Sequence, residues 1–274
     1  MSTDSRTQFP GELRVCSDAE QLAQAGAELF GQLAAESILL RGRFRMALSG
    51  GSTPRRVYEL LATDAFSSHV DWGHVDLFWG DERYVPADDP ESNYRMTAEA
   101  LLRQVAIPPV NIHRVPTEIN PPAAAAEAYE KEIRQCFGDS AIPPQFDLVY
   151  LGLGENGHTA SLFPHSAALK ETSRLVLADF VEEVDMWRIS MSAPLFNRGR
   201  TVAFLIHGQE KAQVLREVLL DPPDPERLPA QLINPEGKLL WMVDEAAAAL
   251  MPRPLRQAKT GLAQESRDRE RRSA

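Results

Sequence analysis

The sequence is poor in cysteine and contains no long apolar run. Only two of its 274 residues are cysteines, Cys16 and Cys136. Because their spacing matches no metal-binding motif, we expect two reduced thiols and no disulfide framework. No stretch approaches the roughly 18 apolar residues of a membrane helix, and the polar start MSTDSRTQFP lacks the apolar core of a secretory signal. These features predict a cytoplasmic globular protein.

Excess positive charge, which nucleic-acid-binding proteins usually carry, is also missing. The formal net charge is −10, so we expect neither nucleic acid nor a membrane as a partner. An anionic small molecule would need a local basic cluster. Residues 253–274 differ, with seven Arg or Lys against three Asp or Glu and few apolar residues. This composition favours a charged, disordered tail over the alternative of a basic recognition segment.

Apolar strand patterns alternate with helical patterns along most of the chain, which predicts an α/β domain with a mainly parallel, Rossmann-like sheet. Ser17 with Glu20 fits a capping box, and Ser92 is a second candidate cap. A run of strand patterns at 175–177, 186–192 and 201–205 predicts a small antiparallel excursion. We divide the chain into an N-terminal extension (1–11), one domain (12–252) and the tail. The further predicted strands are 12–16, 44–48, 75–79, 112–115, 146–151 and 239–243, and predicted helices begin near 17, 54, 93, 122, 209 and 244.

Three unusual loops, at 49–53, 80–83 and 152–158, each follow an apolar strand. Ligands of parallel α/β sheets bind at the carboxyl ends of the strands. We therefore expect these loops to meet around one ligand site.

The first loop consists of Ser49, Gly50, Gly51, Ser52 and Thr53, followed by a proline at the start of a helix. Glycines allow a close approach of the backbone to a ligand, and the start of a helix favours an anion, so phosphate is the ligand that we expect. No Gly-Lys-Ser/Thr follows, which disfavours a nucleoside triphosphate. An ordinary tight turn is the alternative.

Charged residues near the other strand ends are candidates for anion binding. Arg83 could clamp an oxygen, and Asp81 could orient it or contact sugar hydroxyls. Lys211, in the first turn of a helix, is disfavoured by the helix dipole unless an anion is bound. Arg188, on the strand 186–192, is a further candidate cation. Each of these residues, taken alone, could equally be an ordinary surface charge.

His158 stands at the end of the third loop, between Gly157 and Thr159. An imidazole can remove a proton from water near neutral pH and return it to a leaving group. The other histidines lack such a setting. The sequence has no H-x-x-x-H or C-x-x-C motif, so we predict no metal and no cofactor.

Gly152, Gly154 and Gly157 spell G-x-G-x-x-G, the fingerprint of a dinucleotide site. That site requires a continuous helix after the glycines and an acid about 20 residues further on. Asp179 could supply the acid, but Pro164 leaves room for little more than one helical turn after His158. The pattern therefore argues against a dinucleotide.

Five motifs, SGGSTP, WGDERYVP with ESNYRM, GLGENGHTASLFP, HGQEKAQVL and LPAQLINPEGKLLWMVD, occur in the order seen in the 6-phosphogluconolactonases. The chain resembles this family over about residues 12–250. The resemblance implies a single domain of the glucosamine-6-phosphate isomerase type. It also implies metal-independent hydrolysis of 6-phospho-D-glucono-1,5-lactone to 6-phosphogluconate in the oxidative pentose phosphate pathway. We expect a monomer or weak homo-oligomer.

The resemblance further implies that His158 is the general base, that Arg83 and Lys211 hold charged oxygens, and that the 49–53 turn cradles the ligand. Arg188 matches a basic position of the family. The family usually has Pro-Asp-Gly-His where this chain has Glu155-Asn156-Gly157-His158, so the charge that supports the histidine is missing. Our hypothesis is that Asn156 makes His158 a weaker base, with activity shifted to higher substrate or pH demand.

Two alternatives remain open at the level of the sequence. An amino-sugar-phosphate deaminase or isomerase would need an acid a few residues after the histidine, where this chain has Phe163. A non-catalytic sugar-phosphate sensor is suggested only by Asn156.

Overall fold

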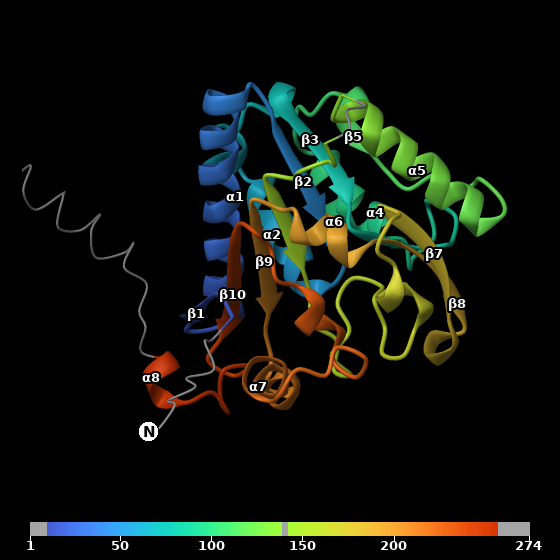
Figure 1. Ribbon diagram of the computed structural model, residues 1–274. Coiled ribbons are helices and arrows are strands. Elements are labelled where there is room, and N and C mark those ends of the chain that lie inside the picture. The colour runs from blue at the N-terminus through green and yellow to red at the C-terminus, as the bar shows by residue number, and fades with distance from the viewer. Residues whose placement is uncertain (1–9, 139–141, 257–274) are drawn as a thin grey trace, which may run out of the picture.

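The computed structural model describes residues 10–138 and 142–256 (Figure 1). Its main feature is a parallel sheet of seven strands in the order β1-β10-β9-β6-β2-β3-β5. This confirms the α/β fold class. The strands are β1 (Glu12–Cys16), β2 (Phe44–Leu48), β3 (Val75–Trp79), β5 (Ile112–His113), β6 (Leu148–Leu151), β9 (Thr201–Ile206) and β10 (Lys238–Asp244).

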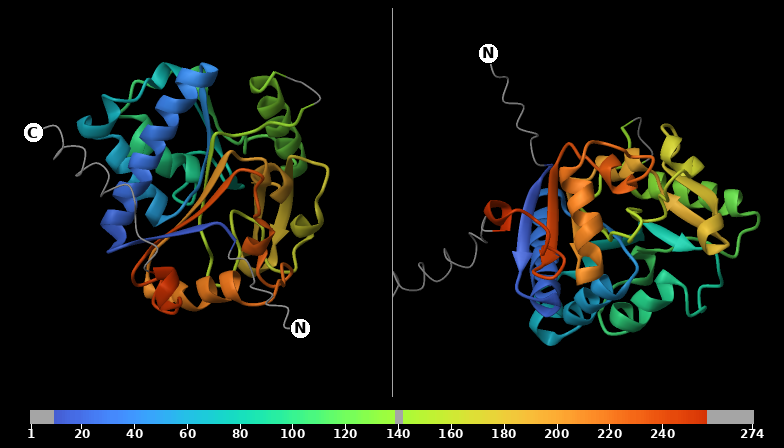
Figure 2. Two further views of the ribbon diagram at one scale, coloured as in Figure 1. Left: turned by 60° about the vertical axis from the view of Figure 1, so that its left-hand side comes forward. Right: turned by 90° about the horizontal axis from the view of Figure 1, so that it is seen from below.

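Helices cover both faces of this sheet, which is why its central strands are apolar almost throughout. All residues of β3, β6 and β9 are buried. Figure 2 shows α1 (Ala19–Arg41) and α5 (Pro122–Cys136) on opposite sides of the strands. The Tyr150 hydroxyl of β6 donates to the Gly26 carbonyl of α1 at 2.6 Å. This bond fixes α1 against the middle of the sheet.

The strand order reverses between β2 and β6, which are hydrogen-bonded neighbours. From β2 the chain proceeds outward to β3 and β5, and from β6 it proceeds the other way to β9 and β10. The loops that leave two such strands diverge and open a crevice at their carboxyl ends. The loops 49–53 and 152–158 leave these two strands.

A second, antiparallel sheet has the order β4-β8-β7 and confirms the predicted excursion for the strand patterns at 175–177 and 186–192. The third pattern, 201–205, was wrongly included, because it forms β9 and pairs in parallel with β6 and β10. Its strands are β4 (Asp81–Arg83), β7 (Val176–Val181) and β8 (Met186–Met191), with a short 3-10 turn at Glu182–Val184 between β7 and β8. Residues 81–83, predicted as loop, are thus a strand, because they pair with β8. This pairing places Arg83 directly opposite Arg188.

The remaining helices are short. They are α2 (Ser52–Leu61), α3 (Asp64–Ser67), α4 (Asn93–Thr97) continued by a π-helical turn at Ala98–Leu102, α6 (Ala193–Asn197), α7 (Ala212–Leu220), which follows a 3-10 turn at Gln209–Lys211, and α8 (Arg253–Arg256). Further 3-10 turns lie at Trp72–His74, Pro109–Asn111, Ala167–Lys170 and Pro229–Leu232. No helix within 10–138 and 142–256 is long and apolar enough to cross a membrane.

Two of the predicted helix features are wrong. Asp18, not Ser17, caps α1: its carboxylate accepts the Gln21 amide at 2.8 Å, while Ser17 donates to Asp18. A carboxylate suits this position because it also meets the positive end of the helix dipole. The closing helix at 244–250 is a series of turns.

The predicted cap at Ser92 is confirmed, whereas the start of the predicted disordered tail is helical. Ser92 caps α4 as predicted, accepting from the Arg95 amide. In the predicted disordered tail, Arg253–Arg256 forms α8. Residues 257–274 lie outside the described residues, so disorder of this part of the tail stays a prediction. Residues 1–9 of the N-terminal extension also lie outside them.

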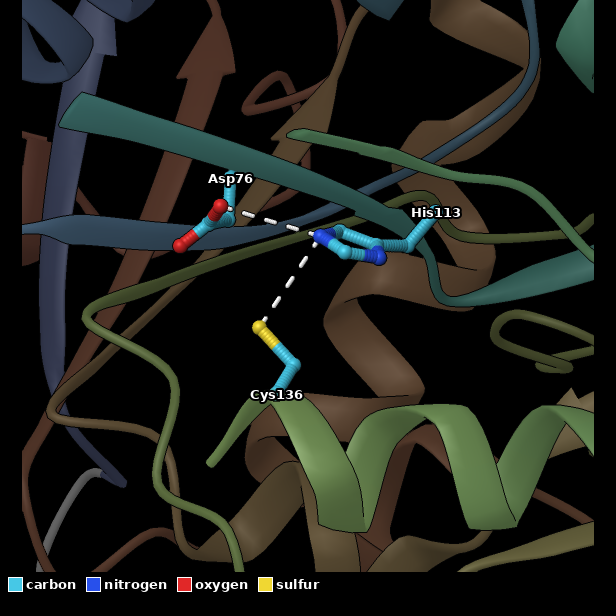
Figure 3. A group of neighbouring side chains, drawn as sticks. All are labelled: Asp76, His113 and Cys136. Atoms are coloured by element: carbon cyan, nitrogen blue, oxygen red, sulfur yellow. Dashed lines mark hydrogen bonds and ion pairs between the residues drawn. The ribbon is translucent and has the colours of Figure 1, made fainter. Parts of the chain in front are cut away.

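An ionic network joins β3, β5 and α5 (Figure 3). His113 Nδ1 lies 2.9 Å from Glu132, and its Nε2 lies 3.7 Å from Asp76 and 3.8 Å from Cys136. Arg43 pairs with Asp76 through two hydrogen bonds of 2.5 and 2.6 Å. Burial alone would lower the pKa of His113, but these acidic neighbours raise it to about 11. His113 is therefore a cation that holds these three elements together.

Candidate active site

A cavity of about 650 Å³ lies at the carboxyl ends of β2, β3, β6 and β9. The three loops singled out in the sequence meet there. Predicted site residues that line it are Ser49, Gly50, Gly51, Ser52, Thr53, Asp81, Arg83, Asn156, His158 and Lys211. Arg188 is the one predicted site residue that is not part of the lining.

The 49–53 loop joins β2 to α2. Gly51 adopts φ +103°, which favours glycine, and no side chain caps the first turn of α2. The Ser49 hydroxyl donates to the Gly50 carbonyl. A Cβ at Gly50 would overlap the side chain of Asn93. The glycine thus permits α4 to pack against the loop.

Glu82, which the sequence did not single out, organises the second loop. Its buried carboxylate accepts backbone amides of Asn93 at 2.7 Å, Tyr94 at 2.8 Å and Arg83 at 2.8 Å. Burial raises the pKa of Glu82, and these amides oppose the shift. Asn93 also donates to the Asp81 carbonyl at 2.9 Å. Glu82 therefore fixes β4, and with it Arg83, against the start of α4.

Three cations act on His158 at the cavity. Arg83 and Lys211 line it. Arg188 lies opposite Arg83 on the paired strand β8, is only 9% exposed, and its Nε has no hydrogen-bond partner. Burial, followed by the charge of Arg83, lowers the pKa of Arg188. Like charges directly opposite each other on paired strands are unfavourable, so this arrangement favours a bound anion.

The glycines of the third loop make room for His158. A Cβ at Gly154 would overlap the His158 ring, and Gly157 has φ +85° with Leu228 close against its Cα. No helix follows: residues 158–165 form turns and isolated bridges. A continuous helix after the glycines is thus missing, in agreement with the argument from Pro164, and a dinucleotide would lack the platform that it needs.

His158 is held on two sides. Its Nδ1 lies 2.6 Å from Asn156 Oδ1, which also accepts the His158 amide at 3.1 Å. Its ring stacks on Phe163, with centroids 4.1 Å apart and planes 17° apart. Burial, and then the charges of Lys211, Arg188 and Arg83, lower the pKa of His158 to about 4. The imidazole is therefore neutral at neutral pH.

Because an amide oxygen can only accept, His158 carries its proton on Nδ1. Its Nε2 makes no hydrogen bond to any described residue. The ring thus offers a free lone pair at the cavity. Asp81 also lines the cavity, and its carboxylate accepts the Ser161 hydroxyl at 2.6 Å.

Glu183 and His207 are cavity residues that sequence reasoning missed. Glu183 accepts two hydrogen bonds from Asn156, although it lies 27 residues further along the chain. His207, expected to have no functional setting, lines the cavity with its Nε2 3.4 Å from Ser52 Oγ. Its position just after β9, whose carboxyl end borders the site, was the available signal.

Among the described residues, one group could offer ligands to a metal: Asp76, His113 and Cys136, whose donor atoms lie within 4.8 Å of one another. Arg43 and Arg45 both contact the Asp76 carboxylate. Two guanidinium groups on one ligand disfavour a further cation. The absence of a metal stays a prediction.

The chain belongs to the family of glucosamine-6-phosphate isomerases/6-phosphogluconolactonase, whose model matches residues 17–241. Among curated relatives, the 6-phosphogluconolactonase of Synechocystis is 43% identical over 77% of this chain and 86% of its own. The human 6-phosphogluconolactonase is 38% identical over 92% of this chain and 98% of its own.

Solved structures support the same grouping. The 6-phosphogluconolactonase from Trypanosoma brucei superposes with a TM-score of 0.79 at 32% identity, covering 89% of this chain and all of that one. A monomeric glucosamine-6-phosphate deaminase gives a TM-score of 0.75 at 19% identity. This second likeness concerns the fold alone.

Proposed function

We propose that the chain hydrolyses 6-phospho-D-glucono-1,5-lactone to 6-phosphogluconate, as a hydrolase of carbohydrate metabolism. Curated relatives that carry the name 6-phosphogluconolactonase match most of the chain. The observation that carries the proposal is a neutral histidine with a free Nε2 in a cavity lined by Arg83 and Lys211, with Arg188 close enough to act on the histidine. A phosphorylated, uncharged lactone ring fits such a site: its phosphate meets the cations, and its carbonyl meets the base.

In the proposed mechanism, His158 Nε2 removes a proton from a water molecule as the water oxygen attacks the lactone carbonyl. Arg83 stabilises the oxyanion of the tetrahedral intermediate. The intermediate then collapses, the bond to the ring oxygen breaks, and His158 returns its proton to that oxygen. The free carboxylic acid ionises in solution.

The remaining cavity residues bind the substrate in this proposal. Lys211 and the start of α2 hold the phosphate, since both offer positive electrostatic potential. Arg188, opposite Arg83 on β8, adds positive charge. Asp81 contacts sugar hydroxyls.

The low pKa of His158 suits a site in which the bound substrate raises the basicity of the histidine. In the free protein burial, and then the charges of three cations, keep the imidazole deprotonated. A bound phosphate dianion offsets their charge, which raises the pKa of His158 and makes it a stronger base when substrate is present. Binding and basicity are thereby coupled.

Phe163 argues against an amino-sugar-phosphate deaminase. It occupies the position where that chemistry needs an acid, and it stacks on His158. A phenyl ring cannot transfer a proton, so ring opening would have no partner there.

The test is a coupled assay in which a dehydrogenase generates the lactone in place and hydrolysis is followed above the spontaneous rate. Glucosamine 6-phosphate is offered in parallel. We expect lactone hydrolysis and no ammonia release. Ammonia release would favour the deaminase, and binding of 6-phosphogluconate without turnover would favour a sensor.

A further inference from the structure

Asn156 is hydrogen-bonded on both sides of its amide. Its Oδ1 accepts from the backbone amide and from Nδ1 of His158. Its Nδ2 donates to both carboxylate oxygens of Glu183, at 3.0 and 2.8 Å. The three side chains form one row from the protein surface to the cavity.

The two ends of this row permit only one orientation of the amide. A flipped Asn156 would turn Nδ2 toward the His158 amide, a donor against a donor, and Oδ1 toward the Glu183 carboxylate, an acceptor against two acceptors. The carboxylate of Glu183 therefore favours the orientation in which Oδ1 faces the imidazole.

We infer that Glu183 is a positioning residue for His158: it orients the Asn156 amide, which holds the proton on Nδ1 and leaves Nε2 free for chemistry. This inference rests on the proposed function where it concerns rate, and on hydrogen bonding alone where it concerns the tautomer. It also gives the hairpin of β7 and β8 a part in the site. The turn between these strands supplies Glu183, and β8 supplies Arg188.

The row changes what an aspartate at position 156 would do. Alone, Asn156→Asp sets a second carboxylate against Glu183, and like charges at hydrogen-bonding distance are unfavourable. When Asn156→Asp is combined with Glu183→Gln, the side-chain amide of the new glutamine can donate to the new aspartate, and the repulsion between two carboxylates is removed. Residues in one hydrogen-bonded network are expected to show such non-additive effects.

The experiment records the imidazole ¹⁵N shifts of His158 together with kcat and KM for the lactone. Glu183→Ala removes both acceptors, Glu183→Gln keeps one acceptor without the charge, and Glu182→Gln removes the same charge one residue away as a matched control. For Glu183→Ala we expect a mixture of Nδ1–H and Nε2–H tautomers and a fall in kcat of about tenfold, with KM within about twofold. Glu183→Gln should lose less than about threefold, and Glu182→Gln should match the parent.

A parental tautomer and kcat in Glu183→Ala would overturn the inference. Equal losses in Glu183→Ala and Glu183→Gln would also overturn it, because charge and not orientation would then matter. The double variant tests the same point independently: Asn156→Asp with Glu183→Gln should be faster than Asn156→Asp alone, and a slower double variant contradicts the positioning role. If the parent shows no lactone hydrolysis, the proposed function fails, while the ¹⁵N shifts still decide the role of Glu183.

Discussion

The imidazole of His158 lies flat against the phenyl ring of Phe163, with the ring centroids 4.1 Å apart. The stack shields one face of the base from water and contributes to the burial that lowers its pKa. Phe163→Leu keeps an apolar side chain but opens this face. We expect the pKa of His158 to rise toward its ordinary value and kcat to fall several-fold, as the ring loses its fixed plane. NMR titration of the His158 ring protons measures the first effect, and an unchanged pKa would show that Phe163 does not shield the ring.

The His158 ring fills the space that a Cβ at position 154 would need, so only glycine fits there. Gly154→Ala places a Cβ onto the imidazole and forces it out of position, so we expect kcat to fall by about a hundredfold or more with the fold retained. Gly152→Ala is the matched control, because a Cβ there meets nothing within 4 Å. Comparable losses of kcat in the two variants would show that any substitution in this loop lowers activity, whether or not it displaces the imidazole.

The charges around His158 predict different pH profiles for the free and the substrate-bound enzyme. The acid limb of kcat/KM reports the free enzyme, and that of kcat the complex. With the pKa of His158 near 4 in the free protein, kcat/KM should be lost only as the pH falls through about 4. The limb of kcat should lie at higher pH, because bound phosphate offsets the cations that lower the pKa. Coincident limbs would contradict the coupling of binding and basicity.

His113 predicts a loss of stability at alkaline pH. Its folded pKa of about 11 lies above the ordinary value of 6.5. The stability that it contributes is therefore complete below pH 6.5 and is lost as the pH rises through about 11. His113→Gln should destabilise the protein by about 3 kcal/mol at pH 6 and by much less near pH 11.

Urea unfolding at the two pH values measures this difference. His74→Gln is the matched control, because its exposed pair with Asp71 is expected to contribute little. A pH-independent effect of His113→Gln would show that His113 contributes through packing and not through its charge.

Much of the fold could be predicted from hydrophobic patterning alone. The runs at 44–48, 75–79 and 201–205 correspond closely to β2, β3 and β9, because strands covered on both faces are apolar almost throughout. Element ends were less predictable. Asp18 and Ser17 are both good caps, and only the structure selects between them. Residues 81–83 became a strand through pairing with β8, a partner more than 100 residues away.

The candidate site was predictable to the extent that it lies in loops after strands. Residues 49–53, Arg83 and His158 converge because parallel strands end at one edge. Glu183 could not be found in this way, since it comes from an antiparallel hairpin whose placement over the site depends on tertiary packing. The sequence-based hypothesis treated Asn156 as a missing charge. The structure instead makes it the middle of a row that ends in a carboxylate.

The central claim is that the imidazole of His158 activates water in this cavity. The direct measurement is the rate of lactone hydrolysis by His158→Ala, compared with the parent in the coupled assay after subtraction of the spontaneous rate. We expect a folded protein that still binds 6-phosphogluconate and has lost at least about 99% of kcat, since a positioned general base contributes about a hundredfold or more. A His158→Ala variant with the parental rate would contradict the mechanism.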